Sequence, residues 1–298
     1  MNTANTLIRR NVKLFFRDKG MFFTSLITPL ILLVLYTTFL GNVYRDAFYA
    51  SLPAGIPIPE KLVDGLVSGQ LVSSLLAVSC VTVSFCSNFL MVQDRANGSI
   101  KDLRITPVKR STMAVSYYVA TLICTLIVCV VAMIAGLIYM AVIGWYLSLL
   151  DVVLLTVDVL LMVLFGTALS SVINYFLSTQ GQISAVGSII SSCYGFISGA
   201  YMPISSFSAG LQKVIMFLPG TYGTSLFRNH AMGGAIQELV AIGVPETHIQ
   251  PLKDTLDCSL YFFGQQVSIG TMYAILSATV VLLLGVYILL NRVKKKKR

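Results

Sequence analysis

The amino-acid sequence predicts an all-α integral membrane protein, and three observations carry that prediction. Of the 298 residues, 56% are hydrophobic and only 11% are charged, whereas soluble domains carry about 25% charged residues. The mean hydropathy is +0.83. The apolar residues also fall in runs close to the roughly 20 residues that a helix needs to cross a bilayer, which excludes a soluble globular domain and a transmembrane β-barrel.

Six apolar runs are long enough to cross the membrane as helices. The predicted spans are 21–41, 67–92, 114–140, 149–174, 183–202 and 268–291. Pro29 lies inside the first run and is tolerated there, because neighbouring helices can satisfy the carbonyl that it frees. This run is longer than the apolar part of a signal peptide and no A-x-A-like site follows it, so we expect an uncleaved first helix.

The first 20 residues predict an amphipathic helix that precedes the membrane domain. Apolar residues such as Leu7 and Phe15 are interspersed with basic residues such as Arg10 and Lys13, a pattern typical of helices that lie at the headgroup level. A disordered basic flank is the alternative. The chain is thus divided into an interfacial helix at 1–20, a six-helix membrane domain at 21–291 and a basic tail at 292–298.

Lysine and arginine are distributed unevenly about the spans. Five lie in 1–20, five in 93–113 and six in 292–298, together sixteen of the 21 in the chain. Because Lys and Arg near helix ends stay on the cytoplasmic side, both termini and 93–113 are predicted to be cytoplasmic, with 203–267 as an external loop. The net charge of +9 follows from this topology and does not indicate a nucleic-acid partner.

Cysteine and histidine show no spacing typical of a metal or catalytic site. Only Cys258 lies in a polar loop, where an intermolecular bridge is an alternative to a free thiol. His230 and His248 are isolated and are expected at the surface of the external loop. No G-x-x-x-x-G-K-[ST] loop and no G-x-S-x-G elbow occurs, so we expect no metal, cofactor or catalytic site in this chain.

Polar and small residues inside the spans are candidates for a transport path or for assembly. Ser73 and Ser84 of the second span either pack against another helix or line a water-accessible path. Asp158 lies within the fourth span, where an ionised carboxylate costs about 2.5–3.5 kcal/mol, so it is expected to face protein or water. A structural hydrogen bond is the default interpretation of Asp158, and a place in the transport path is the alternative.

The fifth span carries small residues at every fourth position. They are Gly187, Ser191, Gly195 and Gly199. Such spacing forms a groove that lets another helix approach closely. The groove is predicted to be an assembly or gate surface, and the alternative is packing within one subunit.

Two segments carry a resemblance to a known family. Residues 93–110 read QDRANGSIKDLRITPVKR, which resembles the coupling-helix loop of ABC-2-type transporter permeases, although Ser99 replaces the usual Thr and Asp94 the commoner Glu. The sequence ISGAYMP at 197–203, followed by LPGTY at 218–222 and by Arg228, resembles the family's fifth helix and its re-entrant external segment. With the six spans and the amphipathic start, the resemblance covers nearly the whole chain.

The resemblance implies a multi-pass subunit of an ATP-driven exporter in the bacterial cytoplasmic membrane. It implies a second permease copy and two copies of a separate ATPase subunit, which binds ATP and Mg. The residues implied to couple the subunits are Asp94, Arg95, Gly98, Asp102, Leu103 and Pro107. The residues themselves agree, because a short charged helix that stops before Pro107, between two anchored spans, can transmit force. An ordinary solvated loop is the alternative.

The sequence indicates the architecture of the protein more narrowly than it indicates the class of substrate. The resemblance implies export of an amphiphilic drug, lipid-like metabolite or peptide, with a lipid-linked polysaccharide as the second choice. Alternatives from other classes are a membrane scaffold and an ion-coupled secondary transporter that uses Asp158, Asn88 or Asn174. A secondary transporter is expected to contain paired inverted repeats, and no convincing internal repeat is visible.

Overall fold

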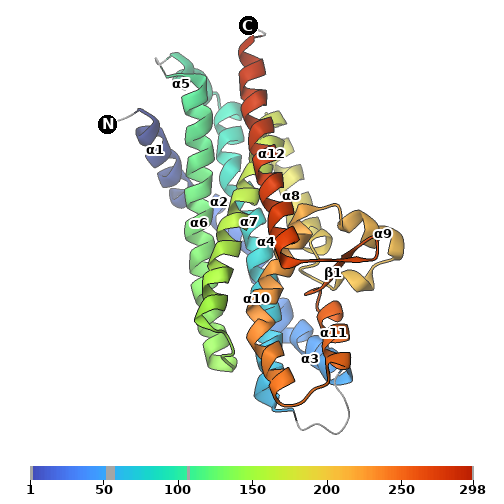
Figure 1. Ribbon diagram of the computed structural model, residues 1–298. Helices are drawn as coiled ribbons and strands as arrows, with labels where there is room; N and C mark the ends of the chain where they lie inside the picture. Colours follow the sequence, from blue (N-terminus) through green and yellow to red (C-terminus); the bar gives the residue numbers. More distant parts are fainter. Residues whose placement is uncertain (1–2, 52–57, 106–107, 297–298) are drawn as a thin grey trace.

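The protein is an elongated bundle of helices with one small two-stranded sheet at its side (Figure 1). The computed structural model describes residues 3–51, 58–105 and 108–296. Both chain ends and the short helix α5 (Ser99–Ile105) lie at one end of the bundle, the terminal end (Figure 1). The opposite, distal end holds the start of α4 (Glu60–Ala96) and the turn between α6 (Arg110–Ile143) and α7 (Leu149–Phe176).

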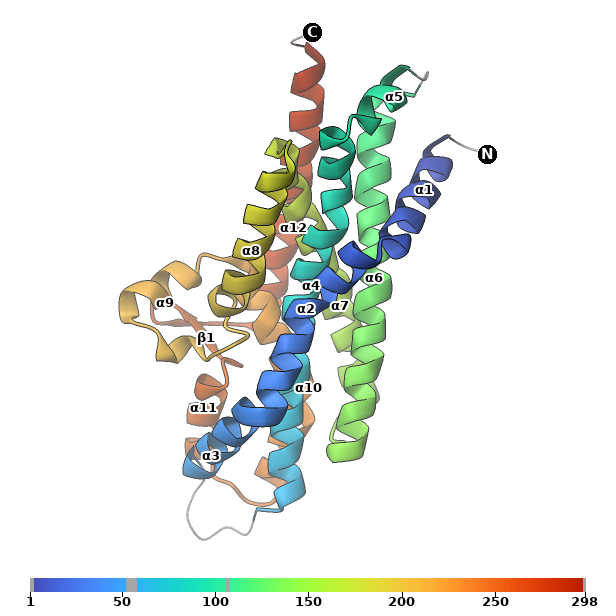
Figure 2. The same ribbon diagram turned by 180° about the vertical axis from the view of Figure 1, so that it is seen from behind.

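The N-terminal segment forms the expected amphipathic helix, α1 (Thr3–Arg17). Leu7, Asn11 and Phe15 are buried, and the helix packs along α6. The chain then bends into α2 (Lys19–Leu35), whose N-terminus is capped by the Asp18 side chain. It continues without a break through a π-helical turn (Tyr36–Leu40) into α3 (Gly41–Ser51), as Figure 2 shows. This helical segment is longer than the predicted span 21–41, because α3 continues it to Ser51.

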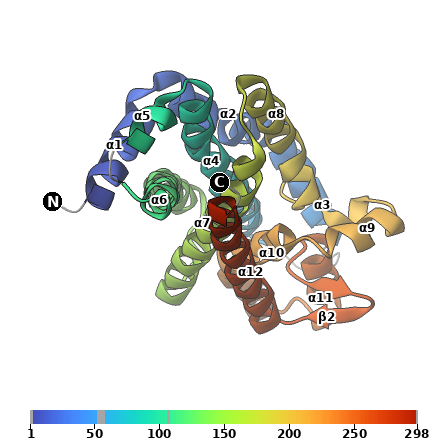
Figure 3. The same ribbon diagram turned by 90° about the horizontal axis from the view of Figure 1, so that it is seen from above.

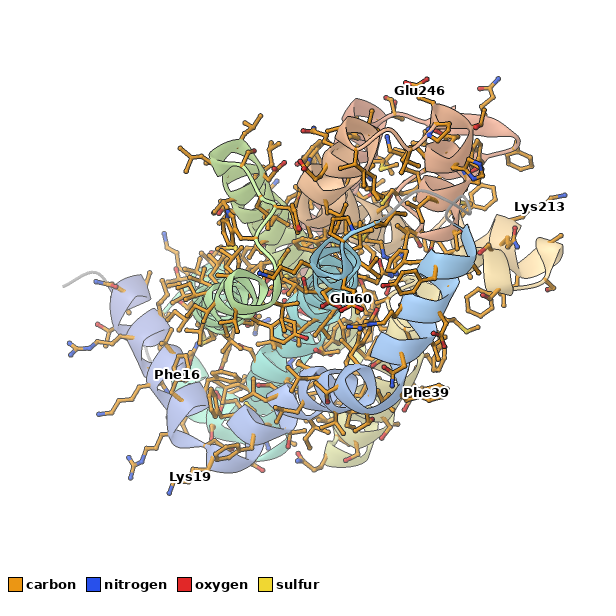
Figure 4. The ribbon with its side chains drawn as sticks, turned by 90° about the horizontal axis from the view of Figure 1, so that it is seen from below. Phe16, Lys19, Phe39, Glu60, Lys213 and Glu246 are labelled. Carbon is orange, nitrogen blue, oxygen red and sulfur yellow. The ribbon has the colours of Figure 1, made fainter. Side chains whose placement is uncertain are left out.

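Five segments of the described residues are long and apolar enough to cross a membrane. They are Lys19–Ala50, Glu60–Ala96, Arg110–Ile143, Leu149–Phe176 and Ile269–Arg292, the last four within α4, α6 (Arg110–Ile143), α7 (Leu149–Phe176) and α12 (Ile269–Lys296). The centre of the bundle is α4, which packs against α2, α6, α7, α8 and α10. Figure 4, viewed from the distal end, places Glu60 near the middle of the molecule, with Lys19, Lys213 and Glu246 towards its edge.

The predicted fifth span corresponds to α8 (Gln180–Ile197), which is more polar than the other five segments and does not qualify as a span by the same measure. Its helix ends at Ile197, earlier than the predicted 202. Gly199 has a left-handed backbone with φ of +74°, and the Tyr201 N–H donates to the Gly195 carbonyl. This geometry is typical of a glycine-terminated helix, so the chain turns back there.

The prediction of an external loop over 203–267 is wrong in its local structure, because this segment is largely helical. It comprises a 3₁₀ turn (Ile204–Ser206), α9 (Ala209–Ile215), α10 (Pro219–Ala241), α11 (Glu246–Thr255) and the antiparallel strands β1 (Leu260–Phe262) and β2 (Gln265–Val267). α10 is buried among α4, α7 and α12. Polar residues of this helix, among them Ser225, Arg228 and His230, have hydrogen-bond partners inside the protein.

Candidate functional site

The terminal end of α4 turns directly into α5. Gly98 has φ of +82°, a left-handed conformation that glycine adopts without a steric penalty. The Gly98 carbonyl accepts a hydrogen bond from the Lys101 N–H in the first turn of α5. The left-handed turn between α4 and α5 therefore explains why a glycine occupies position 98 of the segment that resembles a coupling-helix loop.

Asp94 joins α4 to two other helices. Its carboxylate accepts a hydrogen bond from Arg10 Nη1 of α1 at 2.8 Å and from the Tyr117 hydroxyl of α6 at 2.5 Å. Asp94 is 7% exposed, and its hydrogen bond raises the pKa of Arg10. Asp94 therefore acts within this chain and does not project towards a partner.

Arg95 joins the same end of α4 to the end of α7. Its Nη1 lies 2.8–3.1 Å from the carbonyl oxygens of Asn174, Tyr175 and Leu177. These carbonyls lie at the C-terminal end of α7, where the Leu177 N–H also donates to the Asn174 carbonyl. A cation there complements the negative end of the helix dipole. Together, Asp94 and Arg95 attach the start of the α5 segment to α1, α6 and α7.

The faces of α5 differ in exposure. Leu103 is half-buried and lines a small space beside Leu7 of α1 and Met113 of α6. Asp102 is exposed, and Ile105 is 87% exposed. The apolar residue of α5 that is free to meet a partner is therefore Ile105, whereas Leu103 contacts the bundle. Pro107 lies outside the described residues.

The polar residues proposed for a transport path are buried within this chain. The Ser73 hydroxyl donates to the Gln70 carbonyl, and that of Ser84 donates to the Cys80 carbonyl. Asn88 Nδ2 donates to the hydroxyls of Ser170 and Ser171 on α7. The Asn88 bonds join α4 to α7, as the packing interpretation expects. The Ser73 and Ser84 bonds stay within α4.

Asp158 is also buried, and it joins three helices. Its carboxylate accepts a hydrogen bond from the Tyr273 hydroxyl of α12 at 2.5 Å and lies 2.6 Å from His230 Nδ1 of α10. The structure thus provides the structural hydrogen bond expected for Asp158. The prediction of a surface position for His230 is wrong, because His230 is 6% exposed. His248 is half-buried.

A second buried ion pair lies in the segment interpreted as a loop. Arg228 Nη1 of α10 donates to the Asp257 carboxylate at 2.7 Å, and its Nη2 donates to the Gly199 carbonyl. Neighbouring Cys258 is buried, not exposed in a polar loop, and burial raises its pKa to about 12. A thiol with such a pKa is a poor thiolate source, so the structure gives no support to an intermolecular bridge.

The small residues of α8 contact other parts of the same chain. Gly195 lies against the Tyr201 ring and Gly187 against the Phe89 ring of α4. Tyr201 donates a hydrogen bond to the Ser191 carbonyl. Gly199 lies beyond the end of α8. Within this subunit, therefore, the groove is occupied by Tyr201 and Phe89, as the packing alternative expects.

Comparison with protein families agrees with this arrangement. The sequence model of the ABC-2 type transporter family matches residues 3–231. The chain belongs to the ABC-2 type transporter family. A comparison with curated proteins gives no match. The family match runs from α1 into α10 and includes the α4–α5 segment, so this permease is a multi-pass membrane subunit of a transporter.

The segment after residue 231 lies outside the family match. It contains the end of α10, α11, the β-hairpin and the last span. Arg228 lies within the match and its partner Asp257 outside it. The sequence alone did not suggest this pair, although Pro219 at the first turn of α10 is a helix-start signal that could have identified the helix.

Proposed function

We propose that this chain is the membrane subunit of an ATP-driven exporter and that α5 receives the movement of a separate ATPase subunit. The observation that supports this most is the arrangement of α5. It lies at the terminal end, exposes Ile105 there and follows the end of α4, which is joined to the bundle through Asp94 and Arg95. A force on α5 is thereby transmitted to α1, α6 and α7 through contiguous contacts.

In this proposal the terminal end is cytoplasmic. The segments α1, α5 and the end of α12, which carry basic residues, lie towards this end of the molecule, as the positive-inside rule expects. α8 would be a sixth membrane crossing and would keep both termini on one side. Two permease copies and two ATPase subunits would form the exporter, with ATP and Mg bound by the ATPase.

The presence of an apolar cavity supports the proposal that the exported molecule is amphiphilic. It has a volume of about 570 Å³ and lies between α2, α4 and α6, with Leu26, Leu75 and Val131 among the residues that line it. A cavity with this lining favours the apolar part of a ligand. We therefore propose an amphiphilic drug, lipid-like metabolite or peptide as the exported molecule.

The experiment that tests the coupling role replaces Ile105 by Asp in the reconstituted complex. We expect the Ile105→Asp chain to insert and fold normally, because the side chain is exposed, but to capture less of the ATPase that co-purifies with the unmodified chain. Transport and substrate-stimulated ATP hydrolysis should fall with it. Ile105→Met is the matched control, since it keeps an apolar side chain and should keep the partner.

Leu103→Asp separates coupling from folding. Because Leu103 contacts α1 and α6, we expect this variant to lower the thermal stability of the detergent-solubilised chain, unlike Ile105→Asp. If the Ile105→Asp complex retains its ATPase and transports at the normal rate, α5 is not the coupling helix.

A further inference from the structure

A second cavity, of about 730 Å³, lies between α6 and α12 at the terminal end. The two helices are neighbours there, beside α7, as Figure 3 shows from above. This cavity is on a different part of α6 from the apolar cavity described above. Its mouth is basic, because Lys109 and Arg110 lie at the start of α6 and Arg292 lies near the end of α12.

The interior of this cavity is apolar and aromatic. Val115 of α6 and Ile288 of α12, each about half exposed, face it together with Leu284. The rings of Tyr118 and Tyr287 also line it, with centroids 6.1 Å apart. The Tyr118 hydroxyl is buried and has no hydrogen-bond partner among the described residues. The cavity is therefore amphipathic, with charge at its mouth and an apolar wall along the span.

The positive charge at the mouth is not neutralised by the described part of the chain. Neither Lys109, Arg110 nor Arg292 forms an ion pair with a described acidic residue. The helix dipole of α6 adds to the positive potential, since its N-terminus lies at Lys109, whose side chain caps no backbone N–H. The unpaired N–H groups of a first helical turn bind phosphate and other anions readily.

We propose that this cavity is a binding site for an anionic phospholipid of the surrounding membrane. The phosphate lies at the mouth, between Lys109, Arg110 and Arg292, and one acyl chain lies along Val115, Leu284 and Ile288. Basic pockets between membrane helices recognise anionic headgroups in this way. A zwitterionic lipid lacks the net negative charge that the mouth favours, and free phosphate lacks the chain that fills the apolar wall.

The test titrates lipid into the purified, detergent-solubilised chain and follows its melting temperature. We expect phosphatidylglycerol to raise the melting temperature more than phosphatidylcholine does, because a ligand that binds only the folded state stabilises it. Inorganic phosphate alone should raise it little. Equal stabilisation by the two lipids would overturn the proposal, and full stabilisation by phosphate would indicate an anion site with no role for the lipid chain.

Two sets of variants locate the effect. Lys109→Gln, Arg110→Gln and Arg292→Gln together should weaken the apparent affinity for phosphatidylglycerol, by roughly fivefold for each charge removed. The control removes three exposed basic residues of the same end, Lys13, Arg17 and Lys19, and should leave this affinity nearly unchanged. If both triple variants lose affinity equally, the effect is one of general charge and the site is refuted.

A further variant tests the acyl chain directly. Val115→Trp fills the apolar wall without removing charge, and since Val115 is exposed the fold should tolerate it. We expect this variant to lose most of the stabilisation by phosphatidylglycerol while it keeps its melting temperature in the absence of lipid. Unchanged stabilisation would show that no acyl chain enters the cavity.

Discussion

Two regions of the molecule each contain an arginine–aspartate ion pair, but the two pairs differ in burial. At the terminal end, Arg10 pairs with Asp94, and 32% of the arginine side chain is exposed. In the segment after α8, Arg228 pairs with Asp257, and the two side chains are only 1% and 4% exposed. Each pair joins elements that are distant in the sequence. Burial therefore decides whether such a pair mainly holds the fold together or remains able to change during function.

The charges of the buried pair, Arg228 and Asp257, are stabilised by each other and by neighbouring hydrogen-bonding groups. Burial raises the pKa of the Asp257 carboxyl, and the Arg228 guanidinium counteracts this effect. The Ile204 N–H also donates to Asp257, at 2.9 Å. If either member is removed, the other becomes a buried charge without its ion-pair partner. Water can replace the lost partner at the half-exposed Arg10, so the penalty there is smaller.

The largest effect is expected from Arg228→Met. This variant leaves the Asp257 carboxylate buried and unpaired, so the free energy of unfolding in detergent should fall by about 3–5 kcal/mol. Arg45→Met is the matched control, because Arg45 pairs with Asp64 at the surface, where 44% of the arginine side chain is exposed. Its effect should stay within about 1 kcal/mol. SDS-induced unfolding measures both.

A double variant shows whether the loss comes from unpaired charge. Arg228→Met combined with Asp257→Asn should recover part of the stability, since no buried charge is left unpaired. Asn is the suitable replacement because Asp257 has φ of +50°, a conformation that Asn tolerates better than most residues. If the double variant is no more stable than Arg228→Met, packing and not charge explains the loss.

Most of the membrane architecture could be predicted from the sequence, because it depends on local patterns. Apolar runs predicted the five segments that the structure identifies as long enough to cross a membrane, and alternating basic and apolar residues predicted α1. α8 and α10 were harder, since their polar residues lower the hydropathy. Within α10, Arg228 and His230 are satisfied by Asp257 and Asp158, and sequence alone does not place partners from other elements beside them.

The candidate site could be predicted in position but not in detail. The resemblance located the α4–α5 segment, which the family match contains. Nothing in the sequence indicated that Asp94 faces Arg10 and Tyr117, or that Arg95 caps α7, because these contacts depend on tertiary packing. For the same reason Leu103 was among the residues implied to couple the subunits, whereas the structure exposes Ile105.

An intermediate effect is expected at Asp158. Asp158→Leu leaves the Tyr273 hydroxyl and His230 without an acceptor, so the free energy of unfolding should fall by about 1–3 kcal/mol. Asp158→Asn keeps one acceptor oxygen and should cost less. An ion-coupled secondary transporter predicts the opposite ranking for function, namely that Asp158→Asn abolishes transport at unchanged stability. Transport assays in proteoliposomes, alongside unfolding, separate the two mechanisms.

The smallest effect on folding, and the clearest on function, is expected at Arg10. Arg10→Gln removes the charge of a partly exposed arginine, but its amide can still donate to the buried Asp94 carboxylate, as the Tyr117 hydroxyl does, so the free energy of unfolding should fall by only about 1 kcal/mol. In the proposed mechanism, however, this variant detaches α1 from the end of α4, so transport per ATP hydrolysed should fall while ATP hydrolysis continues. Lys13→Gln removes an equal charge from an exposed position on the same helix and should leave that ratio unchanged.

Exchanging the two charges gives the decisive comparison for this pair. Arg10→Asp combined with Asp94→Arg can rebuild the contact with its polarity reversed. Position 10 borders solvent, whereas the Asp94 side chain is only 9% exposed, so the new arginine has to be accommodated beside Tyr117. If transport per ATP returns towards normal in the exchanged variant, the contact between α1 and α4 itself carries the coupling. If Arg10→Gln already transports normally, α1 contributes to the fold and to membrane attachment, and the force from α5 passes through Arg95 and α7.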